Sequence, residues 1–163
     1  MRILFRTLLY LALITWLGAE IFFPMVAAIT FETLRPDTHT AGMIVGSLLR
    51  IVHGMGLVSA MVAMALLALG GAWGIYKPRT VLVPMALLVL AVGLTIYSQF
   101  SIVPAMERDR INAGGAIDAA ASDNPSRIDF EKLHRESENV EGVILLLGLA
   151  TVVFVARAET GKA

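Results

Sequence analysis

Seven polar side chains lie inside or beside long apolar segments of this chain. Two carboxylates, a fixed guanidinium charge and two histidines that can titrate near neutral pH are among them. Ionisable groups in such surroundings commonly mark a place where a small solute or an ion binds or passes. We therefore take as candidate ligand-binding residues Glu20, Arg50, His53, Gln99, His134, Ser137 and Glu141.

The spacing of these residues places several of them on common helix faces. Arg50 and His53 are three residues apart, and His134 precedes Ser137 by three residues and Glu141 by seven. A charged group in lipid is costly, so it normally faces other helices and pairs there. The pairs we expect are Glu20 with Arg50, and Glu141 with either His53 or Arg50.

Other kinds of chemistry find little support in the sequence. There is no cysteine, which excludes disulfides, thiolate metal sites and cysteine nucleophiles. A formal net charge of zero gives no support to nucleic-acid binding. No nucleotide-binding glycine motif, HExxH motif or nucleophile–base pair is present, so no catalytic residue is assigned and enzymatic activity has little support.

The composition is that of an integral membrane protein. Of the 163 residues, 57% are apolar and only 16% are charged, and the mean hydropathy is +0.76. The apolar residues also form long blocks, whereas a soluble domain distributes them along one face of each element.

Four blocks are long enough to cross a bilayer, which needs about 20 mainly apolar residues. They predict an all-α, polytopic four-transmembrane-helix bundle forming a single domain over residues 1–163. The expected spans are about 7–29, 41–73, 80–103 and 137–156, with an extramembrane loop over 107–136. We expect the fourth helix to be continuous from about Ile128 to Arg157. A cleaved signal peptide ending at Ala19 is the alternative for the first block.

Basic residues beside the short loops predict the orientation. With an even number of spans, three basic groups fall on one side, which we expect to be the cytoplasm of a bacterial cell, with the protein in the inner membrane. The groups are Arg2 with Arg6, Lys77 with Arg79, and Arg157 with Lys162. This topology places the polar residues of all four helices near the outer side. His39, in the polar loop between the first two spans, is expected to be solvated.

Three motifs resemble those of the transmembrane protein 205-like family (domain of unknown function 4149). They are "WLGAEIFF" in the first span, "YSQFSIVPAMERDR" after the third, and "FEKLHRESENVEG" before the fourth. The resemblance rests on Trp16, Gly18, Phe22 and Pro104, then on Phe130, Leu133, His134 and Ser137. Glu141 stands where that family tends to have Asn. The resemblance implies a small four-helix membrane protein with no defined reaction.

The expected role is that of a membrane protein with an outward-facing polar pocket that binds or passes a small solute or ion, without a cofactor. Two alternatives remain open for the function. One is a haem- or copper-binding redox protein with His53 and His134 as ligands, and the other is an accessory subunit of a larger membrane complex. The polar residues could also form a salt-bridged latch that fixes helix register. The lipid bilayer is the expected surrounding, and a homo-oligomer or a membrane-protein partner is possible.

Overall fold

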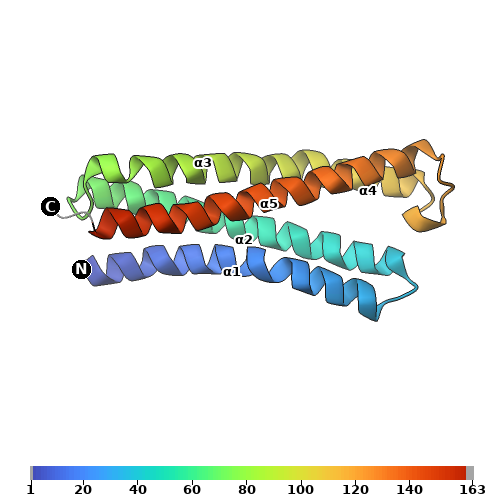
Figure 1. Ribbon diagram of the computed structural model, residues 1–163, viewed down its shortest axis with the longest axis horizontal. Helices are drawn as coiled ribbons and strands as arrows, with labels where there is room; N and C mark the ends of the chain where they lie inside the picture. Colours follow the sequence, from blue (N-terminus) through green and yellow to red (C-terminus); the bar gives the residue numbers. More distant parts are fainter. Residues whose placement is uncertain (1, 161–163) are drawn as a thin grey trace.

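Helices make up almost all of residues 2–160, the part of the chain that the computed structural model describes, and no strand occurs there. Four helical rods lie alongside one another, with both termini at the same end (Figure 1). The rods are α1 (Arg2–Thr33), α2 (Thr38–Ala72), the continuous run of α3 (Leu82–Tyr97), the π-helical turn η2 (Ser98–Ile102) and α4 (Val103–Asn112), and α5 (Pro125–Thr160). Two short 3-10 turns, η1 (Pro78–Thr80) and η3 (Ile117–Ala119), lie in the connections.

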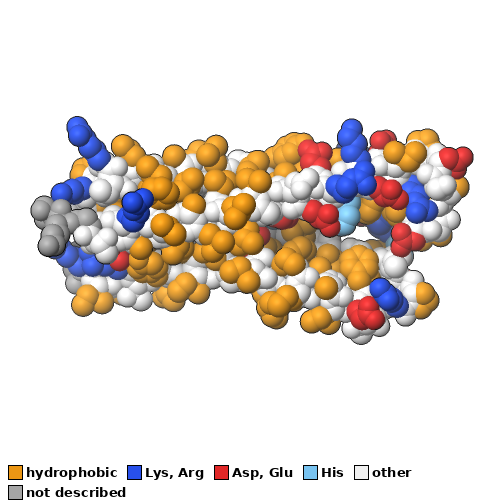
Figure 2. Space-filling model, in the orientation of Figure 1, with side chains coloured by type: hydrophobic (Ala, Val, Ile, Leu, Met, Phe, Trp, Pro, Cys, Tyr) orange, Lys and Arg blue, Asp and Glu red, His pale blue; other side chains and the backbone are white. Residues whose placement is uncertain are grey.

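Within the described residues, four helical segments are long and apolar enough to cross a membrane. This confirms the predicted all-α, polytopic four-helix architecture. The surface agrees, because hydrophobic side chains cover the middle of the bundle while charged side chains gather towards its two ends (Figure 2). We call these the termini end and the loop end, the latter holding the turn at residues 34–37 and the loop at residues 113–124.

The helix bounds differ from the predicted spans mainly at the loop end. The third rod continues through Pro104 to Asn112, with the π-helical turn η2 directly before the proline. Helix α5 starts at Pro125, so the predicted loop over 107–136 is helical at both of its ends. The unbroken α5 confirms the continuous fourth helix. Lys162, one of the predicted basic flank residues, lies outside the described residues.

The apolar core occupies the half of the bundle nearer the termini. Every rod contributes to it, and the close packing depends on small residues on α2 and α5. A Cβ atom at Gly148 would lie 2.6 Å from Leu17, so this glycine lets α1 approach α5. By contrast, the Gly42 and Gly46 pair has no neighbour within 4 Å of the position of a Cβ. The fully buried apolar side chains include Leu9, Leu13, Trp16, Leu67, Leu88, Ile144 and Val155.

At the termini end, Glu159 joins three parts of the chain. It accepts hydrogen bonds from the hydroxyls of Tyr10 (3.0 Å) and Tyr76 (3.2 Å), and Arg6 lies 3.4 Å away. Tyr76 follows α2 and is 3% exposed. Burial, and then the negative charge of Glu159, raise the pKa of Tyr76 to about 12.

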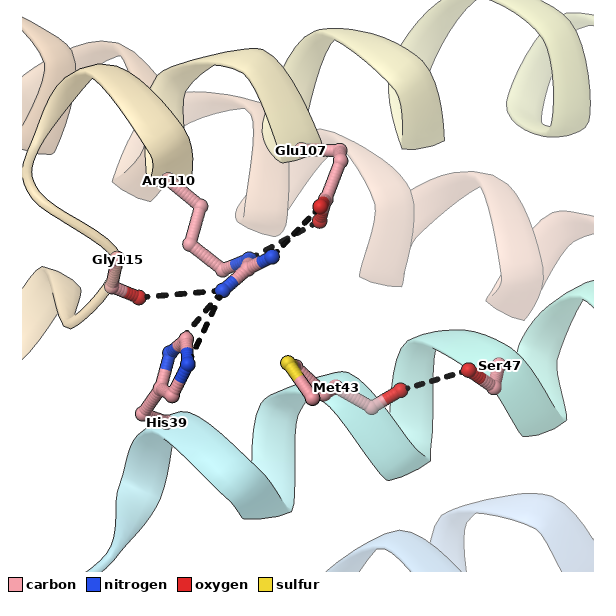
Figure 3. Close-up of polar contacts among 6 residues, drawn as sticks. All are labelled: His39, Met43, Ser47, Glu107, Arg110 and Gly115. Atoms are coloured by element: carbon pink, nitrogen blue, oxygen red, sulfur yellow. Dashed lines mark hydrogen bonds and ion pairs between the residues drawn. The ribbon is translucent and has the colours of Figure 1, made fainter.

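At the loop end, Arg110 of α4 connects to the start of α2. Its guanidinium donates two hydrogen bonds to Glu107, one to the carbonyl of Gly115 at 3.3 Å and one to Nδ1 of His39 at 3.0 Å (Figure 3). The prediction that His39 is simply solvated is therefore wrong. Asp37 caps α2 by accepting hydrogen bonds from Thr40, and these hold the pKa of Asp37 below its usual value.

Candidate functional site

His53 lies at the centre of a buried hydrogen-bond network between three helical rods. It is completely buried on α2. Its Nδ1 lies 2.8 Å from Oε1 of Gln99, and its Nε2 lies 2.8 Å from Oε1 of Glu141. Ser98, which is also fully buried, donates to the same Glu141 oxygen at 2.8 Å. Of the two predicted partners for Glu141, the structure selects His53.

The π-helical turn explains why two consecutive residues both reach this network. In a regular α-helix, neighbouring side chains point about 100° apart, so they rarely serve one site. Within η2, the N–H of Val103 donates to the carbonyl of Ser98, five residues earlier, which widens the turn. Such turns occur frequently at functional sites. Here the turn lets Ser98 contact Glu141 while Gln99 contacts His53.

Glu20 of α1 lies beside this network. Its side chain is 6% exposed, and its Oε1 accepts a hydrogen bond of 3.2 Å from the indole N–H of Trp16, one turn earlier. Its charge interacts with both Glu141 and His53. A Cβ atom at Gly56 of α2 would lie 3.0 Å from Nε1 of Trp16 and 3.9 Å from Oε1 of Glu20. The absence of a side chain at Gly56 therefore makes room for this pair against α2.

Two oxygen atoms in this region lack their usual hydrogen-bond donors. Oε2 of Glu141 is buried, and no donor among the described residues reaches it. The backbone carbonyl of Glu20 loses its usual helical donor, because residue 24 is a proline without an N–H. We call the group of Trp16, Glu20, His53, Ser98, Gln99 and Glu141 the polar cluster. It contains more hydrogen-bond acceptors than donors.

Two of the predicted site residues do not join the polar cluster. Arg50 is exposed, and its charge interacts with Glu107 of α4. Glu20 accepts from Trp16, and no ion pair joins it to Arg50 in the described part of the chain, so the predicted pairing is wrong. His134 is 52% exposed and pairs with Glu138 of its own helix at 3.4 Å.

Ser137, by contrast, is buried one turn before Glu141 on the same helix. The sequence reasoning missed Ser98, Trp16 and Gly56 as members or supports of the site. Trp16 could have been found from its spacing, since it precedes Glu20 by four residues. Nothing in the sequence indicated the π-helical turn that makes Ser98 a partner of Glu141.

The charges of the polar cluster do not balance if all its groups carry their usual charges. Two carboxylates face one imidazole, and the guanidinium of Arg50 lies elsewhere. Both ring nitrogens of His53 are already hydrogen-bonded, so a metal ligand role would require breaking one of these bonds. Chemically, the cluster can accept a positive charge or a proton.

These features define a small polytopic helical membrane protein with a buried acidic and histidine-containing site. Residues 11–110 match the family described as Domain of unknown function (DUF4149), and because the match covers more than half of the chain, the chain belongs to that family. No curated protein and no solved structure matches the chain. The matched region includes Glu20, His53 and Gln99 and ends before α5, which carries Glu141.

Proposed function

We propose that this protein binds a small cation at the polar cluster, from the side of the membrane that faces away from its termini. The observation that carries the proposal is the buried Oε2 of Glu141, which no donor among the described residues reaches. A buried carboxylate oxygen without a donor is costly. A cation between Glu141 and Glu20 would satisfy it and offset the second carboxylate. The resemblance to the transmembrane protein 205-like family implies no defined reaction, so the site alone supports this proposal.

The path to the site is suggested by the shape of the bundle. After Glu20, no residue of α1 is buried up to Thr33. Helices α1 and α5 diverge towards the loop end (Figure 1), and the surface is hollowed between them beside charged side chains (Figure 2). The termini half, in contrast, is closed by the apolar core. The cluster is therefore more accessible from the loop end.

The basic residues at the termini end support placing that end in the cytoplasm of a bacterial inner-membrane protein. Reporter fusions at Lys77 and Asn112 test this sidedness. We expect Lys77 to report the cytoplasm and Asn112 the opposite side. A cytoplasmic Asn112 would place the cation site on the wrong side for this proposal.

Thermal unfolding of the purified protein in detergent tests the binding itself. Methylammonium chloride and sodium chloride are compared at equal ionic strength with N-methylglucamine chloride, which supplies a bulky control cation. A bound cation stabilises the folded state, by about 2.7 kcal/mol at a hundred times its dissociation constant. We expect such a stabilisation by methylammonium or sodium for the native chain.

The matched variants are Glu141→Gln and Glu138→Gln, which make the same chemical change on the same helix. Glu138 is 66% exposed, and within residues 2–160 its ion-pair partner is His134, so its loss should leave cation binding unchanged. Glu141→Gln should abolish the stabilisation. Equal stabilisation of both variants would refute the proposal. If neither small cation stabilises the native chain, and Glu141→Gln unfolds more easily than the native chain, the polar cluster is a structural latch.

A further inference from the structure

A groove lies along the surface of α1 at the termini end, away from the polar cluster. Its volume is about 350 Å³, and it is lined by Ile3, Arg6, Thr7, Tyr10, Leu11 and Ile14. These residues recur three or four positions apart, so they share one face of the helix. The polar members lie nearer the start of α1, and the apolar Leu11 and Ile14, which are 53% and 63% exposed, lie further along it.

Arg6 has more hydrogen-bond donors than the described residues have acceptors for. Its Nε is buried and lies 3.4 Å from Oε1 of Glu159, yet it donates no hydrogen bond there. Its other N–H groups likewise reach no acceptor within residues 2–160. A guanidinium carries five N–H donors in a planar fork that fits a carboxylate or a phosphate. A further anion can therefore bind to Arg6 while Glu159 stays in place.

The charge of the termini end favours an anion at this position. Within residues 2–160, Glu159 is the one acidic residue at this end, and both of its oxygens accept hydrogen bonds from tyrosine hydroxyls. The basic residues there are Arg2, Arg6, Lys77, Arg79 and Arg157. Basic side chains at this end adjoin the apolar surface of the bundle (Figure 2). Basic groups at the edge of a membrane span attract anionic lipid headgroups.

The length of the groove fits one leaflet of a bilayer. From Arg6 to Ile14 the helix rises by about 12 Å, at about 1.5 Å per residue. Half of a hydrocarbon core of ~30 Å is about 15 Å. With a phosphate at Arg6, an acyl chain of the same lipid can lie against Leu11 and Ile14. A soluble phosphate, in contrast, would leave this apolar part of the groove uncovered.

We propose that this groove binds one anionic phospholipid from the leaflet at the termini end, with its phosphate on Arg6 and an acyl chain against Leu11 and Ile14. The hydroxyl of Thr7, which also lines the groove, offers a further donor to the headgroup. The lipid supplies the acceptors that Arg6 lacks. This site is independent of the proposed cation site, because it lies towards the other end of the bundle and shares only the helix α1 with the polar cluster.

Native mass spectrometry in neutral detergent tests the headgroup contact, with phosphatidylglycerol and phosphatidylcholine that carry the same acyl chains. The native chain should bind one phosphatidylglycerol more tightly than further copies and more tightly than phosphatidylcholine. Arg6→Gln should lower the affinity for that first lipid about tenfold or more, since hydrogen bonds to a charged group are lost.

Arg79→Gln is the matched control, because it removes the same charge at the same end from an exposed residue outside the groove. Its effect should be less than about fivefold, as for one basic residue near a charged surface. Equal losses in Arg6→Gln and Arg79→Gln would show general attraction alone and overturn the proposal. Equal binding of the two lipids by the native chain would overturn it as well.

The acyl chain is tested without changing a charge or the contact between Arg6 and Glu159. Ile14→Trp fills the apolar part of the groove and should weaken the binding of phosphatidylglycerol. Leu8→Trp is its control, because Leu8 is exposed on the same helix, lies about 120° around the helix axis from Ile14 and does not line the groove. Unchanged binding in Ile14→Trp would contradict the placement of the chain.

Free glycerol phosphate distinguishes a lipid site from a site for a soluble phosphate. It carries the phosphate of the headgroup without the acyl chains, so an equal concentration should leave phosphatidylglycerol bound. Displacement of the lipid would assign the site to a soluble phosphate compound and overturn the proposal.

Discussion

Replacing Gly56 by alanine should weaken the polar cluster without touching any of its polar groups. The new Cβ would lie 3.0 Å from Nε1 and 3.1 Å from Cδ1 of Trp16, so the indole must move by a few tenths of an ångström. Its N–H then loses alignment with the buried carboxylate of Glu20. A hydrogen bond to a charged group contributes about 1.5–3 kcal/mol, while the change from glycine to alanine within a helix gains about 0.5–1 kcal/mol. The expected net destabilisation is about 0.5–2.5 kcal/mol.

Gly54 provides the matched control, because it lies on the same helix and its Cβ would meet nothing within 4 Å. Gly54→Ala should be neutral or slightly stabilising. Both variants are compared by chemical unfolding in detergent, in a Trp73→Phe background in which Trp16 is the only remaining tryptophan. Gly56→Ala should also shift the Trp16 emission. Equal stabilities of the two variants, with unchanged Trp16 emission, would refute the packing that we describe around Glu20.

Three further predictions concern stability in detergent. In a double-mutant cycle of His53→Ala and Glu141→Ala, each single change should cost about 3–5 kcal/mol, and the double mutant should lose clearly less than their sum; additive losses would show that the buried pair does not interact. Glu20→Ala and Arg50→Ala, in contrast, should be additive within about 0.5 kcal/mol, and a larger coupling would restore the ion pair that the structure lacks. Tyr76→Phe should cost about 1 kcal/mol at pH 7. The pKa of Tyr76 in the folded state is raised to about 12 from 10.0, so the native chain should lose stability as the pH rises through 10 to 12. The Tyr76→Phe variant should lose less stability over this range. Equal losses would place the alkaline transition at another group.

The fold was predictable because membrane helices are determined by the length of their apolar segments. The sequence predicted either His53 or Arg50 as the partner of Glu141, because a carboxylate inside the membrane is stabilised by a nearby histidine or cation. The pairing with His53 was therefore one of two predicted possibilities. The pairing of Glu20 with Arg50 failed because charge alone does not determine which side of α2 faces α1. Gly56 of α2 packs against α1, and this contact sets the rotation of α2 about its own axis. With that rotation, Arg50 is exposed.

The role of Ser98 could not be predicted for a different reason. A π-helical turn depends on a shift of backbone hydrogen bonds, here from Val103 to Ser98, that no side-chain pattern records. Pro104 indicated only that the third membrane span ends near this point. The excess of acceptors in the cluster likewise became visible only when each oxygen atom could be matched with its donors.

The central claim is that a cation lies between the carboxylates of Glu20 and Glu141, and a distance measurement tests it most directly. Solid-state NMR can measure dipolar coupling between 15N-methylammonium and 13C-labelled glutamate carboxyls in lipid vesicles. We predict contacts within ion-pair range, about 4 Å between nitrogen and oxygen, to two carboxyls. Glu20→Gln should lose one contact, Glu141→Gln should lose both because it no longer binds the cation, and Glu138→Gln should retain both. Contacts that survive in both cluster variants, or that depend only on Glu138, would contradict the account.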